Sequence, residues 1–477
     1  VGVQNLTASS EGADLMVGDL MDEITFQYDS SAASGSGSGS GSGSSSSSTF
    51  AYVNNKLALG SQHTCAILDT GDMKCWGGNG VGQLGDGSTT STWGVVPTTP
   101  IDLGTGRTAV AISAGDFHTC AILDNGEAKC WGRDNYGQLG DGGSNTDTNA
   151  PSSTAIDLGM GRTAVAISAG DFHTCAILDN GEAKCWGRDN YGQLGDGGSN
   201  TDTNAPSSTA IDLGMGRTAV AISAGDFHTC AILDTGDMKC WGGNGVGQLG
   251  DGSTVSTNTP SSTAINLGTG RTAVAISAGY SHTCAILDTG DLKCWGSNYY
   301  KQTGYSSQSN ILEPRTDAVD LGSGRTVVAV SAGSAHTCAI LDNGSAKCWG
   351  QSTYGQLGYP QGCNNGCYAF GVGPIDLGTG RTPVAVDTSA GSSDAKSCVI
   401  LDNGEAKCWG SNGGGSLGNT SSSAPQMIPI LVSGNNTWDS STTASSGSSG
   451  GMTNVTGATC SVSPALPTGL NIDSSTC

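Results

Sequence analysis

The sequence predicts an all-β protein whose main part is a seven-bladed β-propeller, and three observations support this. Seven cysteine pairs recur with a constant separation of ten residues, and tryptophan directly follows each second cysteine. The first cysteines of these pairs lie 55, 55, 55, 54, 54 and 60 residues apart, so the chain is a tandem repeat. Each repeat holds four short apolar stretches between turn residues, without helical periodicity. Four-stranded units of this length form propeller blades, and seven of them can close a ring without exposed sheet edges.

The expected strands follow one order in every repeat. In the second repeat they are AVAISAG (109–115), HTCAILD (118–124), AKCWG (128–132) and AIDLG (155–159). A loop rich in Gly, Asn and Asp, ending in GQLG, separates the third stretch from the fourth. Residues 111–165 recur unchanged as 166–220, so two consecutive blades are expected to be identical.

The segment between the paired cysteines predicts a tight hairpin. It reads AILDNG or AILDTG in most repeats, and its glycine suits the positive φ of a three-residue loop with a bulge. This register places the two cysteines opposite each other, where Cα atoms about 4.5 Å apart allow a disulfide. Each short loop closed in this way would stabilise its hairpin by roughly 2–3 kcal/mol.

Zinc is the alternative ligand for these cysteines, but each repeat would offer only two thiolates and one histidine. Disulfides are therefore expected in all repeats, and they imply an oxidising compartment, outside the cell or on its surface. The expected hairpin disulfides join Cys65 with Cys75, Cys120 with Cys130, Cys175 with Cys185, Cys230 with Cys240, Cys284 with Cys294, Cys338 with Cys348 and Cys398 with Cys408. The remaining four cysteines are expected to pair as Cys363 with Cys367 and Cys460 with Cys477.

Charge and hydropathy exclude two classes of partner. Lys and Arg number 19 against 41 Asp and Glu, which gives a net charge of −22. Such a chain repels phosphate backbones and anionic membrane surfaces, so nucleic acid is not an expected partner. No apolar run approaches the roughly 18 residues of a membrane span, so direct membrane insertion is not expected either.

The repeat motif resembles a known family. The pattern AG-xx-HT-x-A, followed by WG-xNxxGQLG, resembles the regulator-of-chromosome-condensation repeat over about residues 51–434, in seven copies. The resemblance implies a seven-bladed propeller. Its intracellular members act as guanine-nucleotide exchange factors or on chromatin, and they usually hold apolar or small residues where this chain has cysteine. The cysteines favour an extracellular variant without the nuclear role.

The flanks resemble fragments of the immunoglobulin-like modules of large surface proteins. ALPTGLNIDSSTC (465–477) is similar to the LP-x-GL-xxD-xx-TG segment of such modules, and residues 12–31 are similar to their opening strands. A run of Gly and Ser indicates a flexible linker. The expected order is an Ig-like fragment (1–31), a linker (32–48), the propeller (49–434), and a linker with a second Ig-like fragment (435–477).

Residues that recur in every blade are interpreted as structural. The six histidines occupy one repeat position, with Lys396 in the seventh, and are expected to hydrogen-bond between strands or blades. The tryptophans after the second cysteines are expected to pack between blades, and the six GRT arginines to pair with acids of their own blades. GVGQLG (80–85) lacks the helix that a dinucleotide site needs. Calcium binding by DGGSNTDTN (141–149) stays open as an alternative to an ordinary turn.

Candidate contact residues lie where the repeats differ. The loops of the fifth and sixth repeats concentrate aromatic side chains, which suit contacts with a protein or a glycan; filling a wider gap between blades is the alternative. The expected contact residues are Tyr299, Tyr300, Tyr305, Tyr359, Tyr368 and Phe370. Four glycosylation sequons also lie outside the repeated blade bodies, at Asn5, Asn419, Asn435 and Asn454.

These features predict a non-enzymatic structural or adhesive module of a large secreted or cell-surface protein, such as a subunit of an extracellular fibre or appendage. No catalytic residue, cofactor or metal site is expected. The expected partners are other copies of the chain or other extracellular structural proteins, with glycans as a further class. The alternative is an extracellular propeller that binds one protein or glycan ligand. Self-association separates the two, because a fibre subunit polymerises alone.

Overall fold

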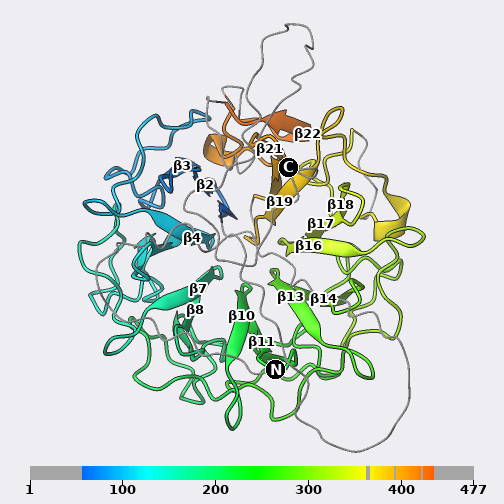
Figure 1. Cartoon of the computed structure of the whole chain (residues 1–477), viewed down its shortest axis with the longest axis horizontal. Coiled ribbons are helices and arrows are strands. Elements are labelled where there is room, and N and C mark those ends of the chain that lie inside the picture. The colour runs from blue at the N-terminus through cyan, green and yellow to red at the C-terminus, as the bar shows by residue number, and fades with distance from the viewer. Residues whose placement is uncertain (1–55, 361–365, 392–393, 420–422, 434–477) are drawn as a thin grey trace, which may run out of the picture. The chain divides into compact units, whose positions relative to one another are not determined.

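Seven antiparallel sheets are arranged in sequence order around a central channel (Figure 1). The computed structural model describes residues 56–360, 366–391, 394–419 and 423–433. The expected Ig-like fragments (1–31 and 435–477) and the linker (32–48) lie outside these ranges. Contacts of β1 with β19 and β20 bring the last blade against the first, so the ring is closed. An all-β propeller with seven repeated blades is therefore confirmed.

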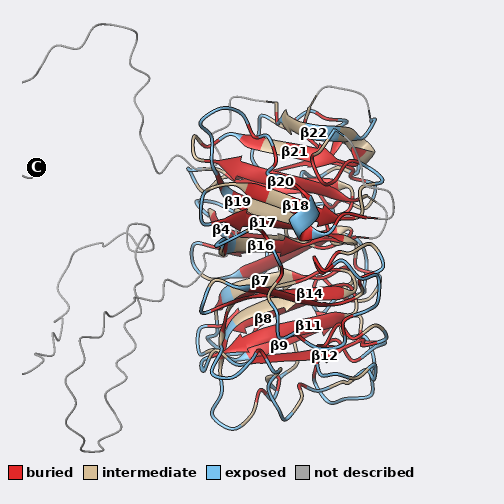
Figure 2. Cartoon of the chain, turned by 90° about the vertical axis from the view of Figure 1, so that its right-hand side faces the viewer, coloured by how far each residue is buried: buried red, intermediate tan, exposed pale blue. Residues whose placement is uncertain are grey.

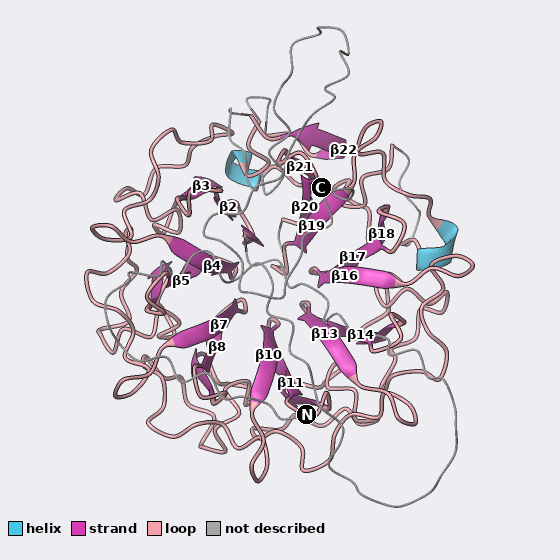
Figure 3. Cartoon of the chain, viewed as in Figure 1, coloured by secondary structure: helices cyan, strands magenta, loops and turns pink. Residues whose placement is uncertain are grey.

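The strands of each blade follow one another in chain order from the channel outwards (Figure 3). Blade 1 contains β1 (Leu57–Leu59), β2 (His63–Ile67) and β3 (Met73–Gly77); blade 2 contains β4 (Ala109–Ala114), β5 (His118–Leu123) and β6 (Ala128–Gly132); blade 3 contains β7 (Ala164–Ala169), β8 (His173–Leu178) and β9 (Ala183–Gly187). Blade 4 contains β10 (Ala219–Ala224), β11 (His228–Leu233) and β12 (Met238–Gly242); blade 5 contains β13 (Ala273–Ala278), β14 (His282–Leu287) and β15 (Leu292–Gly296). Blade 6 contains β16 (Val327–Ala332), β17 (His336–Leu341) and β18 (Ala346–Gly350); blade 7 contains β19 (Pro383–Thr388), β20 (Lys396–Leu401), β21 (Ala406–Gly410) and β22 (Gln426–Leu431). The short 3₁₀ turns η2 (Ala369–Gly371) and η3 (Gly413–Gly415) lie in the loops of blades 6 and 7.

The middle strand of every blade is buried along its whole length, as β5 illustrates. Neighbouring blades cover both faces of this strand, so HTCAIL carries no alternation of apolar and polar residues. The inner strands instead expose one side to the channel, where Val165, Val220, Val328 and Val384 are among the lining residues of a cavity of about 350 Å³. Figure 2 shows the buried strands with exposed loops at both ends.

The expectation of four strands in every blade was wrong. Only blade 7 has a fourth strand, β22, whereas the other six sheets have three in the described part of the chain. In blade 2 the outer segment meets β6 at two points, through Thr148 opposite Gly132 and through the Ile156 amide on the Ala128 carbonyl. Because eight residues separate Thr148 from Ile156 while four separate their partners, the excess length loops away from the sheet. The corresponding stretch of blade 7 is shorter, so more of it can pair.

The hairpin between the second and third strands has the predicted form. In blade 2 the Gly126 amide donates to the Leu123 carbonyl, and the Leu123 amide donates to the Glu127 carbonyl. Gly126 has a φ of 78°, which completes a three-residue loop. Cys120 therefore faces Cys130 in the ladder, with a Cα to Cα distance of 4.1 Å.

All seven expected hairpin disulfides are present, one in each blade, and each joins cysteines that face each other across the second and third strands. In chain order they link Cys65 to Cys75, Cys120 to Cys130, Cys175 to Cys185, Cys230 to Cys240, Cys284 to Cys294, Cys338 to Cys348 and Cys398 to Cys408. No cysteine in the described part of the chain is free.

The other two expected disulfides fall partly or wholly outside the described ranges. Cys367 is buried, pairs with Gly350 through two backbone hydrogen bonds and is itself disulfide-bonded. Its expected partner, Cys363, lies outside the described ranges, as do Cys460 and Cys477. No helix in these ranges is long and apolar enough to cross a membrane.

Candidate interaction face

One end of the ring carries two sets of loops that could contact a partner. The turn between the first and second strands lies beside the loop that follows the third strand, because His118 pairs with Gly132 in the ladder. We call this end the loop face. The hairpin turns between the second and third strands lie at the opposite end, which we call the hairpin face.

Arginine and aromatic side chains occupy equivalent loops on the loop face of blades 2 to 5. The Arg133 guanidinium lies 4.1 Å from the ring centre of Phe117, and Arg188 lies 5.0 Å from Tyr136 and 5.3 Å from Phe172. Ring contacts extend the group to the edge of blade 5. We call it the arginine–aromatic face, and its members are Phe117, Arg133, Tyr136, Phe172, Arg188, Tyr191, Phe227 and Tyr280.

The two arginines of this face differ from the other seven in the chain. Those seven each form an ion pair with an aspartate, whereas Arg133 and Arg188 form none within the described ranges. Their Nε atoms are buried without a hydrogen-bond partner, although both arginines are only partly buried. Each guanidinium therefore lies against aromatic rings while part of the residue stays exposed.

Three carboxyl groups lie in equivalent turns of the same face. Asp116, Asp171 and Asp226 are almost fully buried, and at least one oxygen of each lacks a hydrogen-bond partner. Burial is the main reason that the pKa of Asp116 is raised to about 6 and that of Asp226 to about 7, and it raises the pKa of Asp171 well above its usual range. Near neutral pH these groups therefore carry less than three negative charges. No group of three or more His, Cys, Asp or Glu side chains in the described ranges is placed to hold a metal.

Neither the three aspartates nor the arginine–aromatic face was predicted from the sequence. The available signals were the DFHT motif of blades 2 to 4 and the WGRDNYGQ motif of blades 2 and 3. Contact residues were expected where the repeats differ, yet repetition places the same side chains on consecutive blades and so extends the surface.

The aromatic residues predicted as partner contacts separate into two groups. Tyr299 and Phe370 are 64% and 58% exposed, and Tyr368 is 36% exposed. Tyr299 packs edge-on against Tyr300, and the Lys301 ammonium lies 5.9 Å from the Tyr368 ring. These side chains remain available for contacts on blades 5 and 6.

Tyr305 and Tyr359 instead pack inside the blades. The Tyr305 hydroxyl donates to the Asp317 carbonyl at 2.9 Å, and the Tyr359 hydroxyl donates to the Gly373 carbonyl at 2.7 Å. Burial raises the pKa of both phenols above the range in which they would ionise. Both hydroxyls are therefore bonded within the loops of their own blades.

The histidines form hydrogen bonds between neighbouring blades, as expected. The Thr119 hydroxyl donates to the Gln83 carbonyl at 2.9 Å and therefore accepts from His63 Nε2 at 2.8 Å. Burial lowers the pKa of His63 well below its usual value, so the ring is neutral, and its Nδ1 is buried without a partner. Burial lowers the pKa of His118 to about 3 and that of His228 to about 4. Fully buried, neutral imidazoles in this position cannot exchange protons with a ligand at neutral pH.

Tryptophan strengthens the same joints between blades. Trp131 Nε1 donates to the Gln83 carbonyl of the preceding blade at 3.1 Å, and every repeated tryptophan is fully buried. Gly85 follows closely in the same loop, and a Cβ atom there would collide with the Trp131 indole. The tryptophans therefore pack between blades and offer no exposed ring to a sugar.

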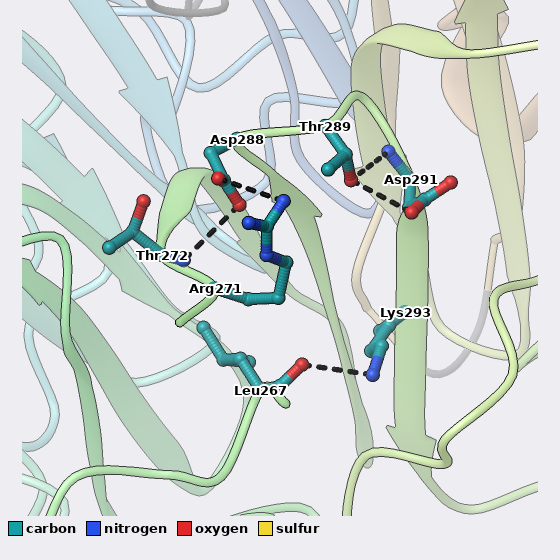
Figure 4. Close-up of polar contacts among 7 residues, drawn as sticks. All are labelled: Leu267, Arg271, Thr272, Asp288, Thr289, Asp291 and Lys293. Carbon is teal, nitrogen blue, oxygen red and sulfur yellow. Dashed lines mark hydrogen bonds and ion pairs between the residues drawn. The ribbon is translucent and has the colours of Figure 1, made fainter. Parts of the chain in front are cut away.

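The hairpin face carries the GRT arginines, each paired with an aspartate. Figure 4 shows one example, in which Arg271 binds Asp288 with an Nη1 to Oδ2 distance of 3.1 Å. Asp288 also accepts from the Thr272 amide, while Lys293 of β15 donates to the Leu267 carbonyl at 2.9 Å. These cations are occupied by their own repeat, as the sequence predicted. Of the four sequon asparagines, Asn419 is partly buried near the end of a described segment, and Asn5, Asn435 and Asn454 lie outside the described ranges.

Comparison with known proteins agrees with this architecture. The chain is 33% identical over 254 residues to the Ultraviolet-B receptor UVR8 of Arabidopsis thaliana, which covers 53% of this chain and 56% of UVR8. It is 28% identical over 303 residues to the E3 ubiquitin-protein ligase HERC2 of Homo sapiens, covering 63% of this chain and 6% of HERC2. The chain thus spans about half of the first relative and a small part of the second.

Solved structures share the fold at low sequence identity. The crystal structure of Prp20p from Saccharomyces cerevisiae matches with a TM-score of 0.65 and 20% identity, over 81% of this chain and 88% of that one. Human WBSCR16 matches with a TM-score of 0.57 and 20% identity, over 70% and 86% of the two chains. Models of the Regulator of chromosome condensation (RCC1) repeat match residues 55–83 and 109–138, and 71–122 and 125–177. The model of the RCC1-like domain matches residues 154–453, well over half of the sequence, and this chain therefore belongs to the RCC1-like domain family.

Proposed function

We propose that this chain is a non-enzymatic structural or adhesive module of a large secreted or cell-surface protein, and a subunit of an extracellular fibre or appendage. The observation that carries the proposal is the buried disulfide in every one of the seven blades. Disulfides persist in oxidising compartments, and each one ties a hairpin whose tryptophan contacts the preceding blade; in blades 1 to 6 the histidine of the same hairpin contacts the next blade. This construction favours mechanical and proteolytic resistance.

The repeated histidines, tryptophans and GRT arginines all interact with other residues of the propeller. The histidines are neutral and buried between blades, the tryptophans are buried, and the GRT arginines are ion-paired. What varies between blades is exposed loop surface, most clearly around Tyr299 and Phe370. A rigid ring with distinctive loops suits contacts with other macromolecules.

A second candidate function is favoured by one specific observation. Within the described ranges, Arg133 and Arg188 are the only arginines without an aspartate partner, and both are held on aromatic rings. Such a surface suits a ligand that carries both negative charge and apolar groups. An extracellular ligand-binding propeller would use it.

Sedimentation and negative-stain microscopy of the full chain test the proposal. We expect concentration-dependent, head-to-tail assembly, and weaker assembly with an unchanged melting temperature in the variant Tyr299→Ser/Tyr300→Ser/Tyr368→Ser. Trp93→Ser is the matched control, because Trp93 is 67% exposed on blade 1. A chain that stays monomeric at all concentrations would contradict the fibre role and favour the ligand-binding propeller.

A further inference from the structure

The arginine–aromatic face holds two guanidinium groups that form no ion pair within the described ranges. A guanidinium without an ion-pair partner is unusual in an acidic protein, since this chain has more than twice as many acids as bases. Arg133 and Arg188 are also fixed in position by the rings of Phe117, Tyr136 and Phe172. A carboxylate that binds such a preorganised guanidinium forms charge-assisted hydrogen bonds without ordering a flexible side chain.

The rings define the rest of the ligand chemistry. Tyr191 is 44% exposed, and Phe172, Phe227 and Tyr280 are partly buried beside it. A small inorganic anion would use the two positive charges and leave these rings uncovered. A peptide segment with several carboxylates and several apolar side chains would use both.

Buried carboxyl groups nearby do not exclude an acidic ligand. Arg133 acts on Asp116 and Arg188 on Asp226, in each case lowering a pKa that burial raises. No cation acts on Asp171 in this way, and burial raises its pKa well above the usual range. The two guanidiniums therefore offset part of this carboxyl charge, and protonation reduces the rest.

The chain itself contains a segment with the complementary chemistry. Residues 11–26, EGADLMVGDLMDEITF, hold five acids and seven large apolar side chains, and residues 1–55 contain no Lys, Arg or His. A Gly- and Ser-rich stretch of 26 residues (30–55) connects this segment to the first described residue, Lys56. A Gly/Ser-rich chain of that length spans about 28 Å on average and gives an effective concentration in the millimolar range.

We propose that the arginine–aromatic face docks residues 11–26 of its own chain, with Arg133 and Arg188 binding carboxylates of the segment and the rings covering its apolar side chains. The connecting stretch joins blade 1, whose Gly60–Gln62 turn lies on the loop face three residues after Leu57, so blades 2 to 4 are near its attachment point. The docked segment covers the loop face. The inference goes beyond the proposed function, since it does not require the chain to polymerise.

Hydrogen–deuterium exchange of the full chain tests this docking. We expect amides of residues 11–26 to exchange about tenfold more slowly in the unmodified chain than in Arg133→Gln/Arg188→Gln. Arg162→Gln/Arg217→Gln is the matched control, because these arginines lie on the hairpin face in exposed ion pairs. The control should keep the slow exchange, and all variants should keep the seven hairpin disulfides.

A second variant removes the charge from the segment instead of the face. Asp19→Asn/Asp22→Asn/Glu23→Gln leaves the propeller unchanged and should accelerate exchange of residues 11–26 as the arginine variant does. Added salt should have the same effect, because the contact is electrostatic. Equal exchange in the unmodified chain and both variants overturns the docking.

Concentration dependence identifies the chain that supplies the segment. Protection that stays constant on dilution supports docking within one chain, whereas protection that disappears on dilution assigns the segment to a second copy and overturns the intrachain form. The two proposals can fail separately: a monomeric chain with a protected segment contradicts only the fibre role. A polymer with a freely exchanging segment contradicts only the docking.

Discussion

Side chains align each blade with its neighbour, but the joint between blades 7 and 1, which we call the seam, uses different residues from the joints between consecutive blades. At five regular joints a serine hydroxyl on an inner strand accepts from a backbone amide of the next blade, as Ser113 does from Ala169 at 2.9 Å. At the seam Asp387 takes the serine position and accepts from the Leu59 amide at 2.9 Å. Lys396 takes the histidine position and donates to the Gly60 and Ser61 carbonyls.

The difference follows from connectivity. Consecutive blades are joined by the chain itself, so neutral hydrogen bonds are enough to align them. Nothing in the backbone brings blade 7 to blade 1, and buried charged groups there penalise any misalignment that leaves them unpaired. Burial lowers the pKa of Lys396 to about 7 and raises that of Asp387 to about 6, so the seam is also the joint most sensitive to pH.

The largest effect is expected from removing a joint tryptophan. Trp76→Ala at the seam and Trp186→Ala at a regular joint each delete a fully buried indole and should cost about 3–5 kcal/mol of stability. Trp76 Nε1 donates to the Ser416 carbonyl of blade 7, so its loss should also open the seam locally. Hydrogen exchange should then accelerate first in β1 and β19.

Trp186→Ala should show no such local opening, because the chain still connects blades 2 and 3. Its exchange should accelerate across the ring only with global unfolding. If both variants showed the same exchange pattern, the seam would not be a separate weak point.

The next effect concerns pH. Lys396 has a pKa of about 7 in the folded chain, against an ordinary value of 10.5, so between these values the unfolded state binds more protons. Stability therefore rises with pH from about 7 towards 10, by up to about 1.4 kcal/mol per pH unit for one proton. Asp387, Asp394 and Asp116 act on the same ammonium and moderate the effect. Lys396→His, which installs the residue of the regular joints, should remove this rise.

Denaturant titrations at several pH values measure that slope. Lys396→Met serves as a control for side-chain length without charge, and it should lose the slope as well. Below pH 6.5 the buried histidines also make stability rise with pH. Their pKa values are low in the folded chain, so the free energy of unfolding decreases as the pH falls. An unchanged slope above pH 7 in both variants would show that Lys396 does not control it.

Elements that depend on local sequence could be predicted. The hairpin turn, the facing cysteines and the GRT ion pairs all follow from spacing within about 20 residues, and the structure agrees with each. The absence of a fourth strand in blades 1 to 6 could not be predicted, because the apolar sequence of the outer segment was consistent with a strand. Whether this segment pairs depends on the length of chain between its two contacts with the third strand.

The seam and the arginine–aromatic face depend on which blades become neighbours. Lys396 was recognised as the exception among the histidines, but its partners Gly60 and Ser61 lie more than 330 residues away. Arg188 reaches rings of blades 2, 3 and 4, and no single repeat contains that arrangement. Tyr305 and Tyr359 were chosen because they lie in variable loops, yet variability does not distinguish an exposed ring from a packed one.

The smallest effect is expected at the second departure from the serine pattern, which lies in blade 1. Ala58 occupies the position of Ser113 in the ladder, so the joint between blades 1 and 2 lacks the hydroxyl acceptor that the five regular joints have. Ala58→Ser should supply an acceptor for the Ala114 amide and stabilise the ring by about 0.5–1 kcal/mol. Ser168→Ala should act in the opposite direction, since it removes the acceptor of the Ala224 amide. Urea unfolding midpoints compare the two, and a destabilised Ala58→Ser variant would mean that the first joint is packed too tightly to accept the repeat's own residue.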